Sequence, residues 1–250
     1  MKIIEVYRIK DWYHYLGFVL IGFFLNSSFD SRLFLLLLTC SFMLSYAFSF
    51  NDFWDNGKKA YFVFPLFLSF LLFPFLNMMQ ILLASIFLFI VTIYSLKPIR
   101  LKAKPFLSSL CNGVGFTILF LLGYCLQSLD IKGLIFFMLF FCFNMVAQFI
   151  HEVVDLEEDK KNKDITTAVF LGEKNIKILS HTFLWLAFFF ALYLFILKLV
   201  NFLFLLATFF FTSFFSYRLV KDRIDSNLRK KYRSLGIITG LVYLFSITLW

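Results

Sequence analysis

The sequence predicts an all-α integral membrane protein, in which nine transmembrane helices are bundled around a central cavity open to the cytoplasmic side. The 250 residues are 61% hydrophobic and only 16% charged, far from the averages of water-soluble domains. The mean hydropathy is +0.86. Apolar segments near the roughly 20 residues that cross a bilayer recur along the whole chain, so one anchor on a soluble body cannot explain this composition.

Nine apolar segments follow one another, and the short polar stretches between them leave no room for a soluble domain. We therefore expect residues 1–250 to form a single transmembrane domain. The first segment has no small-residue cleavage site after it, so it is predicted to be a retained helix and not a signal peptide. The segments lie at about 12–26, 32–50, 60–76, 78–96, 106–127, 133–150, 178–198, 202–220 and 234–250, with a tight turn at "KLVN" between the seventh and eighth.

The basic residues support this segmentation independently, because Lys and Arg near helix ends concentrate on the cytoplasmic side. With the N-terminus in the cytoplasm, all but three of the 24 Lys and Arg residues fall on that side, the exceptions being Arg32, Lys132 and Lys198. A wrong number of spans would have removed this asymmetry. The chemistry is therefore expected on the cytoplasmic face of the cell membrane, and no nucleic-acid partner is expected.

The second apolar segment ends in the acidic sequence "NDFWD". On a helix, Asp52 and Asp55 are three residues apart and Asn51 and Asp55 four apart, so all three side chains share one face. Ser45 continues a track of small polar residues on the preceding turns. We expect the helix to continue through this acidic stretch, which contains no proline.

The sixth apolar segment ends in a stronger version of the same pattern. Polar residues recur there at helical spacing, again without proline, at Asn144, Gln148, Glu152, Asp155 and Asp159. A polar side chain at membrane depth costs about 1–3 kcal/mol or more unless it has a partner, so this stripe indicates a cavity inside the protein. The sequence leaves open whether His151 and Glu152 have structural roles or belong to the active site.

Two carboxylate groups that face one cavity repel each other unless cations lie between them. Oxygen ligands that leave coordination positions open suit Mg²⁺, which phosphate oxygens of a substrate can complete. Basic residues occupy the connection between the two acidic segments, at Lys97, Arg100, Lys102 and Lys104. The pattern therefore predicts a lipid-soluble substrate with a diphosphate head, whose hydrocarbon tail enters the apolar bundle.

Four stretches resemble motifs of the UbiA-type intramembrane prenyltransferases, in the family's order and from end to end of the chain. "NDFWD" at 51–55 resembles the motif NDxxDxxxD, and "DLEEDKKNKDITTAVFLG" at 155–172 resembles DxExDxxxGxxTxxxxLG. "YSLKPIRLK" at 94–102 is similar to YSxPPxRLK, and "YRIKDWYHYLGFVLIG" at 7–22 resembles the Arg and Trp that open the family's first helix. Nine spans is also the family's number.

The resemblance implies which residues form the active site. The catalytic, metal-binding residues would be Asn51, Asp52, Asp55, Asp155 and Asp159, holding two Mg²⁺ ions. The diphosphate would be bound by Arg100 and Lys102, with Tyr94, Lys97, Lys59 and Arg8 beside them. The pocket would be lined by Asn112, Asn144 and Gln148.

The sequence departs from the family pattern at two places. Lys59 replaces the last Asp of the first motif, and either Lys163 or Asp164 replaces the Gly of the second. The first change either weakens one metal site or places Lys59 in contact with phosphate.

The implied activity is Mg²⁺-dependent transfer of a prenyl group from a polyprenyl diphosphate to a lipophilic acceptor, with release of diphosphate. The acceptor would be an aromatic quinone precursor or a carotenoid or other isoprenoid lipid, and membrane lipid surrounds the protein. A cation-coupled transporter is one alternative, although it should carry ionisable groups near mid-membrane. The other is a CDP-alcohol phosphotransferase, whose acidic residues lie close together on one segment with Gly and Arg between them.

Overall fold

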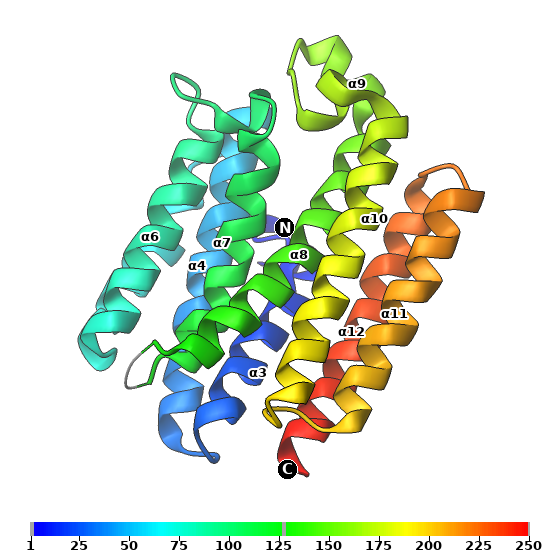
Figure 1. The fold of residues 1–250 in the computed structure, drawn as a ribbon. Coiled ribbons are helices and arrows are strands. Elements are labelled where there is room, and N and C mark those ends of the chain that lie inside the picture. Colours follow the sequence, from blue (N-terminus) through cyan, green and yellow to red (C-terminus); the bar gives the residue numbers. More distant parts are fainter. Residues whose placement is uncertain (1–2, 127–128, 250) are drawn as a thin grey trace. The chain divides into compact units, whose positions relative to one another are not determined.

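The computed structural model describes residues 3–126 and 129–249, and every regular element in those ranges is helical (Figure 1). The short elements at the N-terminus are α1 (Ile3–Val6), α2 (Ile9–Trp12) and the 3₁₀ turn Tyr13–Tyr15. The remaining helices are α3 (Leu16–Asn26), α4 (Ser31–Asn56), α5 (Val63–Leu72), α6 (Met78–Ser95), α7 (Leu107–Tyr124), α8 (Ile131–Val154), α9 (Leu156–Asn162), α10 (Thr167–Ile196), α11 (Phe202–Lys221) and α12 (Ser226–Thr248), with 3₁₀ turns at Phe73–Phe75 and Leu101–Ala103.

Each apolar segment predicted from the sequence coincides with a helix. Within the described residues, six helices are long and apolar enough to cross a membrane: α4, α6, α7, α8, α10 and α11. The other three segments fall on α3, on α5 with its following 3₁₀ turn, and on α12. The protein is therefore an all-helical integral membrane protein, and the count of nine spans stays a prediction.

The helix ends follow the local sequence signals. The side chains of Asp30, Asp130 and Asn201 accept hydrogen bonds from backbone N–H groups in the first turns of α4, α8 and α11. Gly57 ends α4 with a positive φ of 62°, a conformation that glycine adopts without steric cost. α10 ends at Ile196 and α11 begins at Phe202, which confirms the break predicted at "KLVN".

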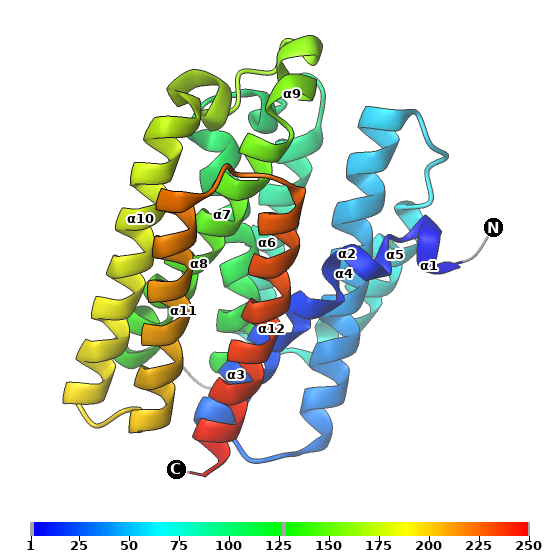
Figure 2. The ribbon, with the colours of Figure 1, turned by 90° about the vertical axis from the view of Figure 1, so that its right-hand side faces the viewer.

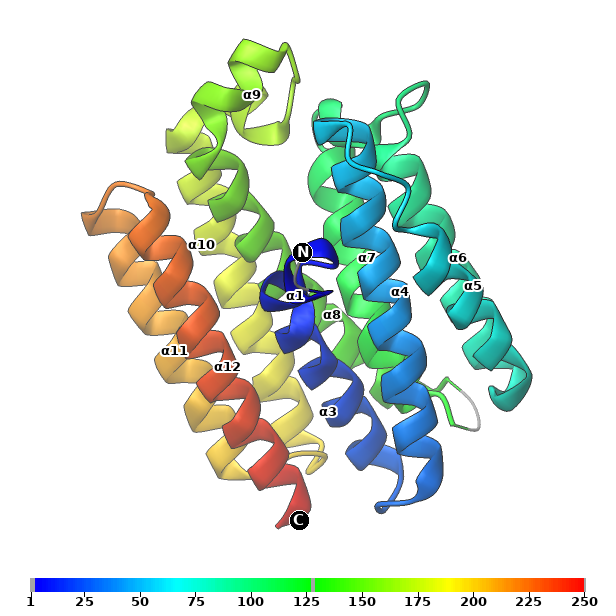
Figure 3. The same cartoon turned by 180° about the vertical axis from the view of Figure 1, so that it is seen from behind.

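The helices divide into two compact units. The first contains Met1–Leu101 and Ile118–Leu129, and the second contains Lys102–Thr117 and Asp130–Trp250. In the first unit, α4 packs against α3, α5 and α6 (Figure 3). The hydroxyl groups of Tyr46 on α4 and Thr92 on α6 form a hydrogen bond of 2.7 Å inside this packing.

Two glycines let α3 and the C-terminal part of α7 approach closely within the first unit. A Cβ atom on Gly22 would collide with the backbone oxygen of Phe120, and one on Gly123 would collide with the backbone oxygen of Val19. Small residues at helix crossings are the usual route to tight packing in membranes, where apolar burial alone gives little driving force.

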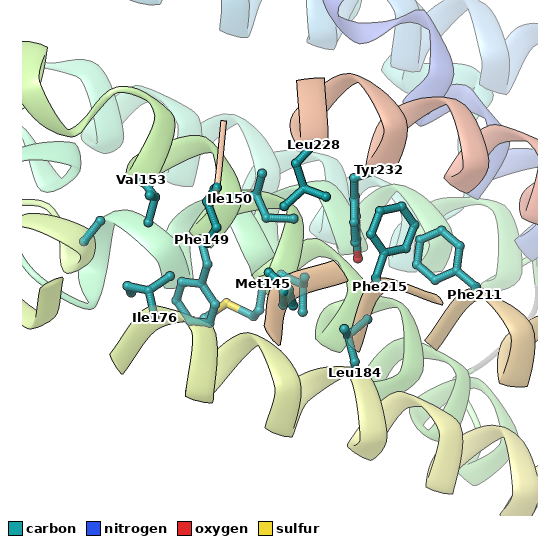
Figure 4. Packing of buried hydrophobic residues seen from close by; sticks show 14 residues of the cluster. Met145, Phe149, Ile150, Val153, Ile176, Leu184, Phe211, Phe215, Leu228 and Tyr232 are labelled. Atoms are coloured by element: carbon teal, nitrogen blue, oxygen red, sulfur yellow. The ribbon is translucent and has the colours of Figure 1, made fainter. Parts of the chain in front are cut away.

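The second unit is built around α8, α10, α11 and α12. α8 contacts α10 and α12, and α11 lies between α10 and α12 (Figure 2). Their shared core is apolar and includes Met145, Phe149, Leu184 and Phe215 (Figure 4). Tyr232 enters this core from α12 and donates a hydrogen bond of 2.9 Å to the backbone oxygen of Phe143.

The acidic stretches are helical, with one correction. The first lies entirely on α4, as predicted. In the second, α8 ends at Val154 and α9 begins at Leu156, so the predicted continuous helix is interrupted at Asp155. The backbone N–H of Asp159 still donates to the oxygen of Asp155 at 2.9 Å, which keeps the chain close to helical across the break.

Candidate active site

Asp52 is the most deeply buried carboxylate of the first acidic segment, with 3% of its surface exposed. Two basic side chains neutralise it. The Nη1 atom of Arg8 lies 3.3 Å from Oδ1, and Nζ of Lys58 lies 2.6 Å from Oδ2. Asn56 also donates to Oδ1, at 3.1 Å. The turn at Gly57 returns the chain toward α4, which brings Lys58 back over Asp52.

Arg8 is fixed in place by several contacts. Its Nε atom donates to Asp11 at 2.8 Å, and its guanidinium lies 5.3 Å from the ring centroid of Phe48. Its own backbone has a positive φ of 51°. The structure thus brings the predicted residue Arg8 to the first acidic segment, although more than forty positions separate it from Asp52 in the sequence.

The connection after α6 lies against the same helix end. Ser95 donates a hydrogen bond of 3.0 Å to Oδ1 of Asn51, and Nη1 of Arg100 lies 3.2 Å from Oδ1 of Asp55. Arg100 has a positive φ of 40° in the turn that carries it. The acidic motif and part of the "YSLKPIRLK" motif therefore meet within the first unit.

The other predicted basic residues lie around this point or beyond it. Tyr94 is half-buried at the end of α6, while Lys97 and Lys59 are exposed to solvent. Lys102 lies in the 3₁₀ turn Leu101–Ala103 and belongs to the second unit. No contact of Lys59 with phosphate is tested by this arrangement, so that role stays a prediction.

Asp155 of the second acidic segment lies between a histidine and an arginine. His151 Nδ1 is 2.8 Å from Oδ2, and Nη1 of Arg229, on α12, is 3.2 Å from Oδ1. Burial raises the pKa of Asp155, but the hydrogen bond and charge of His151 together with Arg229 outweigh it, so the pKa lies below its usual value. This carboxylate is ionised at neutral pH.

Asp159 has the opposite electrostatic character. Burial and the negative charges of Asp155, Asp164 and Glu152 raise its pKa to about 6, against a hydrogen bond of 3.1 Å from Thr166 that lowers it. A carboxylate whose charge is disfavoured by neighbouring carboxylates gains from a bound cation.

Glu152 has a structural role that the sequence left open. It is 4% exposed, and its Oε1 accepts hydrogen bonds from Ser108 at 2.9 Å, Ser109 at 2.8 Å and Gln148 at 3.1 Å. Its Oε2 accepts from the backbone N–H of Ala168 at 3.1 Å. Glu152 therefore ties the start of α7 and the start of α10 to α8.

The polar residues predicted to share one face of the sixth apolar segment lie on α8, and that face is turned toward α7. Asn144 donates to Thr117 at 2.9 Å, and Gln148 accepts from Asn112 at 2.8 Å. These mutual hydrogen bonds remove the cost of placing polar groups at membrane depth. The structure thus brings together the three predicted pocket residues and their partners, while the cavity that they would line stays a prediction.

The donor atoms of both acidic segments suit a hard divalent cation. Among residues 3–126 and 129–249, no three His, Cys, Asp or Glu side chains are grouped so that they could hold a metal ion by themselves. A Mg²⁺ site here would depend on few carboxylates, with amide, water and phosphate oxygens completing it, which is the usual arrangement for Mg²⁺ at phosphate groups. Asn51, Asp52 and Asp55 belong to the first unit, and Asp155 and Asp159 to the second, so their convergence on one substrate stays a prediction.

Sequence reasoning missed several residues that contact the acidic side chains. Lys58 had a weak signal, since a basic residue directly after a helix-ending glycine can fold back on the helix. Arg229 gave no sequence signal, because it comes from a different helix and lies far from Asp155 along the chain. Ser108 and Ser109 could have been noticed only by asking which side chains donate hydrogen bonds to a carboxylate on an apolar helix.

The fold matches those of solved membrane proteins over nearly the whole chain. A UbiA homologue from Archaeoglobus fulgidus bound to GPP and Mg²⁺ matches with a TM-score of 0.80 and 20% identity, covering 100% of both chains. A digeranylgeranylglyceryl phosphate synthase matches with a TM-score of 0.79 and 18% identity, covering 99% of this chain and 98% of the other. A UbiA homologue from Aeropyrum pernix K1, in its apo form, gives 0.72 and 13%, covering 97% and 98%.

A comparison of sequences adds the family. No functionally curated protein matches the chain. The family profile described as "UbiA prenyltransferase family" matches residues 58–238, well over half of the sequence. The chain therefore belongs to the UbiA family of membrane prenyltransferases.

Proposed function

We propose that this prenyltransferase carries out Mg²⁺-dependent transfer of a prenyl group from a polyprenyl diphosphate to a lipophilic acceptor. One observation carries the proposal furthest. At the end of the apolar helix α4, Asp52 and Asp55 are held by Arg8 and Arg100, two basic residues from distant parts of the chain. Such a mixed group of anions and cations suits a substrate that brings both metal ions and phosphates.

The basic residues bind the diphosphate in this proposal. Arg100 and Lys102 hold it, with Tyr94, Lys97, Lys59 and Arg8 beside them. The planar guanidinium of an arginine can donate two parallel hydrogen bonds to phosphate oxygens, which fixes the orientation of the head group as well as its charge. Two related structures, both of a UbiA homologue from Archaeoglobus fulgidus, contain Mg²⁺ with DMAPP or with GPP.

The carboxylate and amide oxygens hold the metal. Asn51, Asp52 and Asp55 from one segment and Asp155 and Asp159 from the other would bind Mg²⁺, which when bound neutralises the charge that develops on the departing diphosphate. The allylic C–O bond breaks with its electron pair going to the diphosphate. A nucleophilic carbon of the acceptor bonds to the prenyl carbon and then loses a proton. The apolar helices exclude water, which would otherwise capture the allylic cation.

The location and the acceptor complete the proposal. The active site opens to the cytoplasmic side of the cell membrane, within a single domain of nine spans. The acceptor is an aromatic quinone precursor or a carotenoid or other isoprenoid lipid, and the polar residues Asn112, Asn144 and Gln148 line the pocket that receives it. Aromatic side chains facing the cavity stabilise the allylic cation by about 0.5–2 kcal/mol each.

The test is an assay of the purified full chain in lipid nanodiscs with Mg²⁺, a prenyl diphosphate and a panel of acceptors. We expect diphosphate release that depends on the acceptor, and a prenylated product by mass spectrometry. Asp52→Ala and Asp155→Ala should lower turnover at least a hundredfold. Glu158→Ala is the matched control, because Glu158 is exposed on α9 and stands at a variable position of the second motif. Full turnover in both aspartate variants would refute the site assignment.

A further inference from the structure

In the contact between Lys58 and Asp52, a half-exposed lysine side chain pairs with a buried carboxylate. The Lys58 side chain is 49% exposed, whereas that of Asp52 is 4% exposed. Lys58 Nζ is 2.6 Å from Oδ2, and Oδ1 is occupied by Arg8 and Asn56. Lys58 is thus the cation on the Asp52 oxygen that Arg8 does not contact.

A metal ion and Lys58 compete for this oxygen. Mg²⁺ binds oxygen ligands at about 2.0–2.1 Å and demands octahedral geometry. An ammonium group held by the same oxygen would lie within a few ångströms of the dication, and like charges at that separation repel each other. Binding of metal to Oδ2 of Asp52 is therefore opposed as long as Lys58 keeps its position.

The two basic partners of Asp52 differ in how easily they can leave. Arg8 also binds Asp11 and lies over the ring of Phe48, so it is anchored from three sides. Lys58 lies directly after the positive-φ glycine that ends α4, with half of its side chain already in solvent. When Lys58 moves away from Asp52, water hydrates its ammonium group in place of the lost ion pair.

We propose that Lys58 is a built-in counter-ion of the first acidic segment, which competes with Mg²⁺ for Asp52 and so sets the Mg²⁺ concentration at which this segment binds metal. The inference rests on the proposed function in taking Asp52 as a metal ligand. Lys58 keeps the buried carboxylate neutralised when metal is absent and yields its position when metal binds. An ion pair with a half-exposed lysine is weak, so removal of Lys58 should strengthen Mg²⁺ binding by about fivefold.

The experiment is a Mg²⁺ titration of the full chain in nanodiscs, without diphosphate and at constant ionic strength. The readout is the midpoint of thermal unfolding, which rises as metal binds to the folded state. Lys58→Gln should lower the Mg²⁺ concentration for the half-maximal rise about fivefold, and Lys58→Arg should stay near the wild type. Lys174→Gln removes the same charge from an exposed position on α10 that has no predicted site role, and should change the value less than twofold.

A second background makes the assignment specific to Asp52. In Asp52→Asn protein, the further change Lys58→Gln should have no effect on the Mg²⁺ response. The proposal is overturned if Lys58→Gln matches the wild type, if Lys174→Gln shifts the response equally, or if the effect persists in the Asp52→Asn background. If Mg²⁺ leaves the midpoint of the wild type unchanged, Asp52 binds no metal without diphosphate and this inference fails, whereas the proposed function is tested separately by the turnover of the Asp52→Ala and Asp155→Ala variants.

Discussion

From the hydrogen bonds of Glu152 we predict how substitutions of this residue change the free energy of unfolding, independently of catalysis. In Glu152→Ala protein, the Gln148 side-chain amide and the Ala168 N–H lose their acceptor. Ser108 and Ser109 stay 3.2 and 2.6 Å from the Thr167 hydroxyl, which can accept from only one of them because it also accepts from the Phe106 N–H, so one serine hydroxyl loses its acceptor as well. A buried donor left without a partner costs about 1–3 kcal/mol, so the three orphaned donors together should cost about 3–9 kcal/mol. Glu152→Gln keeps one acceptor oxygen but turns an NH₂ group toward a donor, and should cost about 1–3 kcal/mol.

The assay is reversible unfolding in mixed micelles, followed by circular dichroism, together with hydrogen exchange at the start of α10. We expect the order wild type, Glu152→Gln and then Glu152→Ala in falling stability, with faster exchange at the Ala168 amide in the alanine variant. Glu158→Ala removes an exposed carboxylate from α9 and should leave both measurements unchanged. A stability of Glu152→Ala within about 0.5 kcal/mol of the wild type would show that water replaces the carboxylate and that the reasoning is wrong.

Two further predictions concern helix packing and substrate binding. Gly22→Leu should destabilise the first unit by several kcal/mol, because even a Cβ atom at Gly22 meets the backbone of α7. The control Gly17→Leu changes a position with open space and should be nearly neutral. Unfolding in lipid compares the two variants, and equal stabilities would contradict the close crossing of α3 and α7. Arg100→Ala should raise the KM for the prenyl diphosphate about 10- to 100-fold, because a charge-assisted hydrogen bond to the substrate is lost. Arg223→Ala, which changes an exposed arginine outside the site, is the control. An unchanged KM in Arg100→Ala would exclude Arg100 from diphosphate binding.

The helices could be predicted from sequence because each depends on local information. The apolar segments, the break at "KLVN" and the helical first acidic stretch were all recovered. The polar stripe on α8 was also readable, since a buried Asn144 or Gln148 needs a partner and helical spacing shows on which face that partner lies.

The interruption at Asp155 was missed for a physical reason. The surrounding sequence is compatible with a helix, and the local contacts stay nearly helical across the break. At the interruption, Asp155 is paired with a residue from outside the segment, Arg229 on α12. A pairing between positions so far apart leaves no trace in spacing or hydropathy, and the same is true of Ser108 and Glu152.

The position of the acidic residues on their helix explains why basic side chains gather around them. The C-terminal end of a helix carries partial negative charge from its unpaired carbonyl groups, so carboxylates are favoured at the N-terminal end and disfavoured at the C-terminal end. Asp52 and Asp55 lie in the final turns of α4, at the unfavourable end. Helix and carboxylates therefore add to one negative potential beside an apolar, low-dielectric interior.

That potential has to be balanced by cations from elsewhere. Arg8, Lys58 and Arg100 come from three separate segments: Arg8 and Lys58 contact Asp52, and Arg100 contacts Asp55. If the purpose were stability alone, apolar residues at the end of α4 would achieve it without burying charge, because a buried ion pair is seldom more stabilising than a packed apolar side chain. The retained carboxylates make sense where cations must be exchanged. A site whose negative potential already holds one loosely anchored ammonium can accept a divalent ion in its place, and then the phosphates that accompany it.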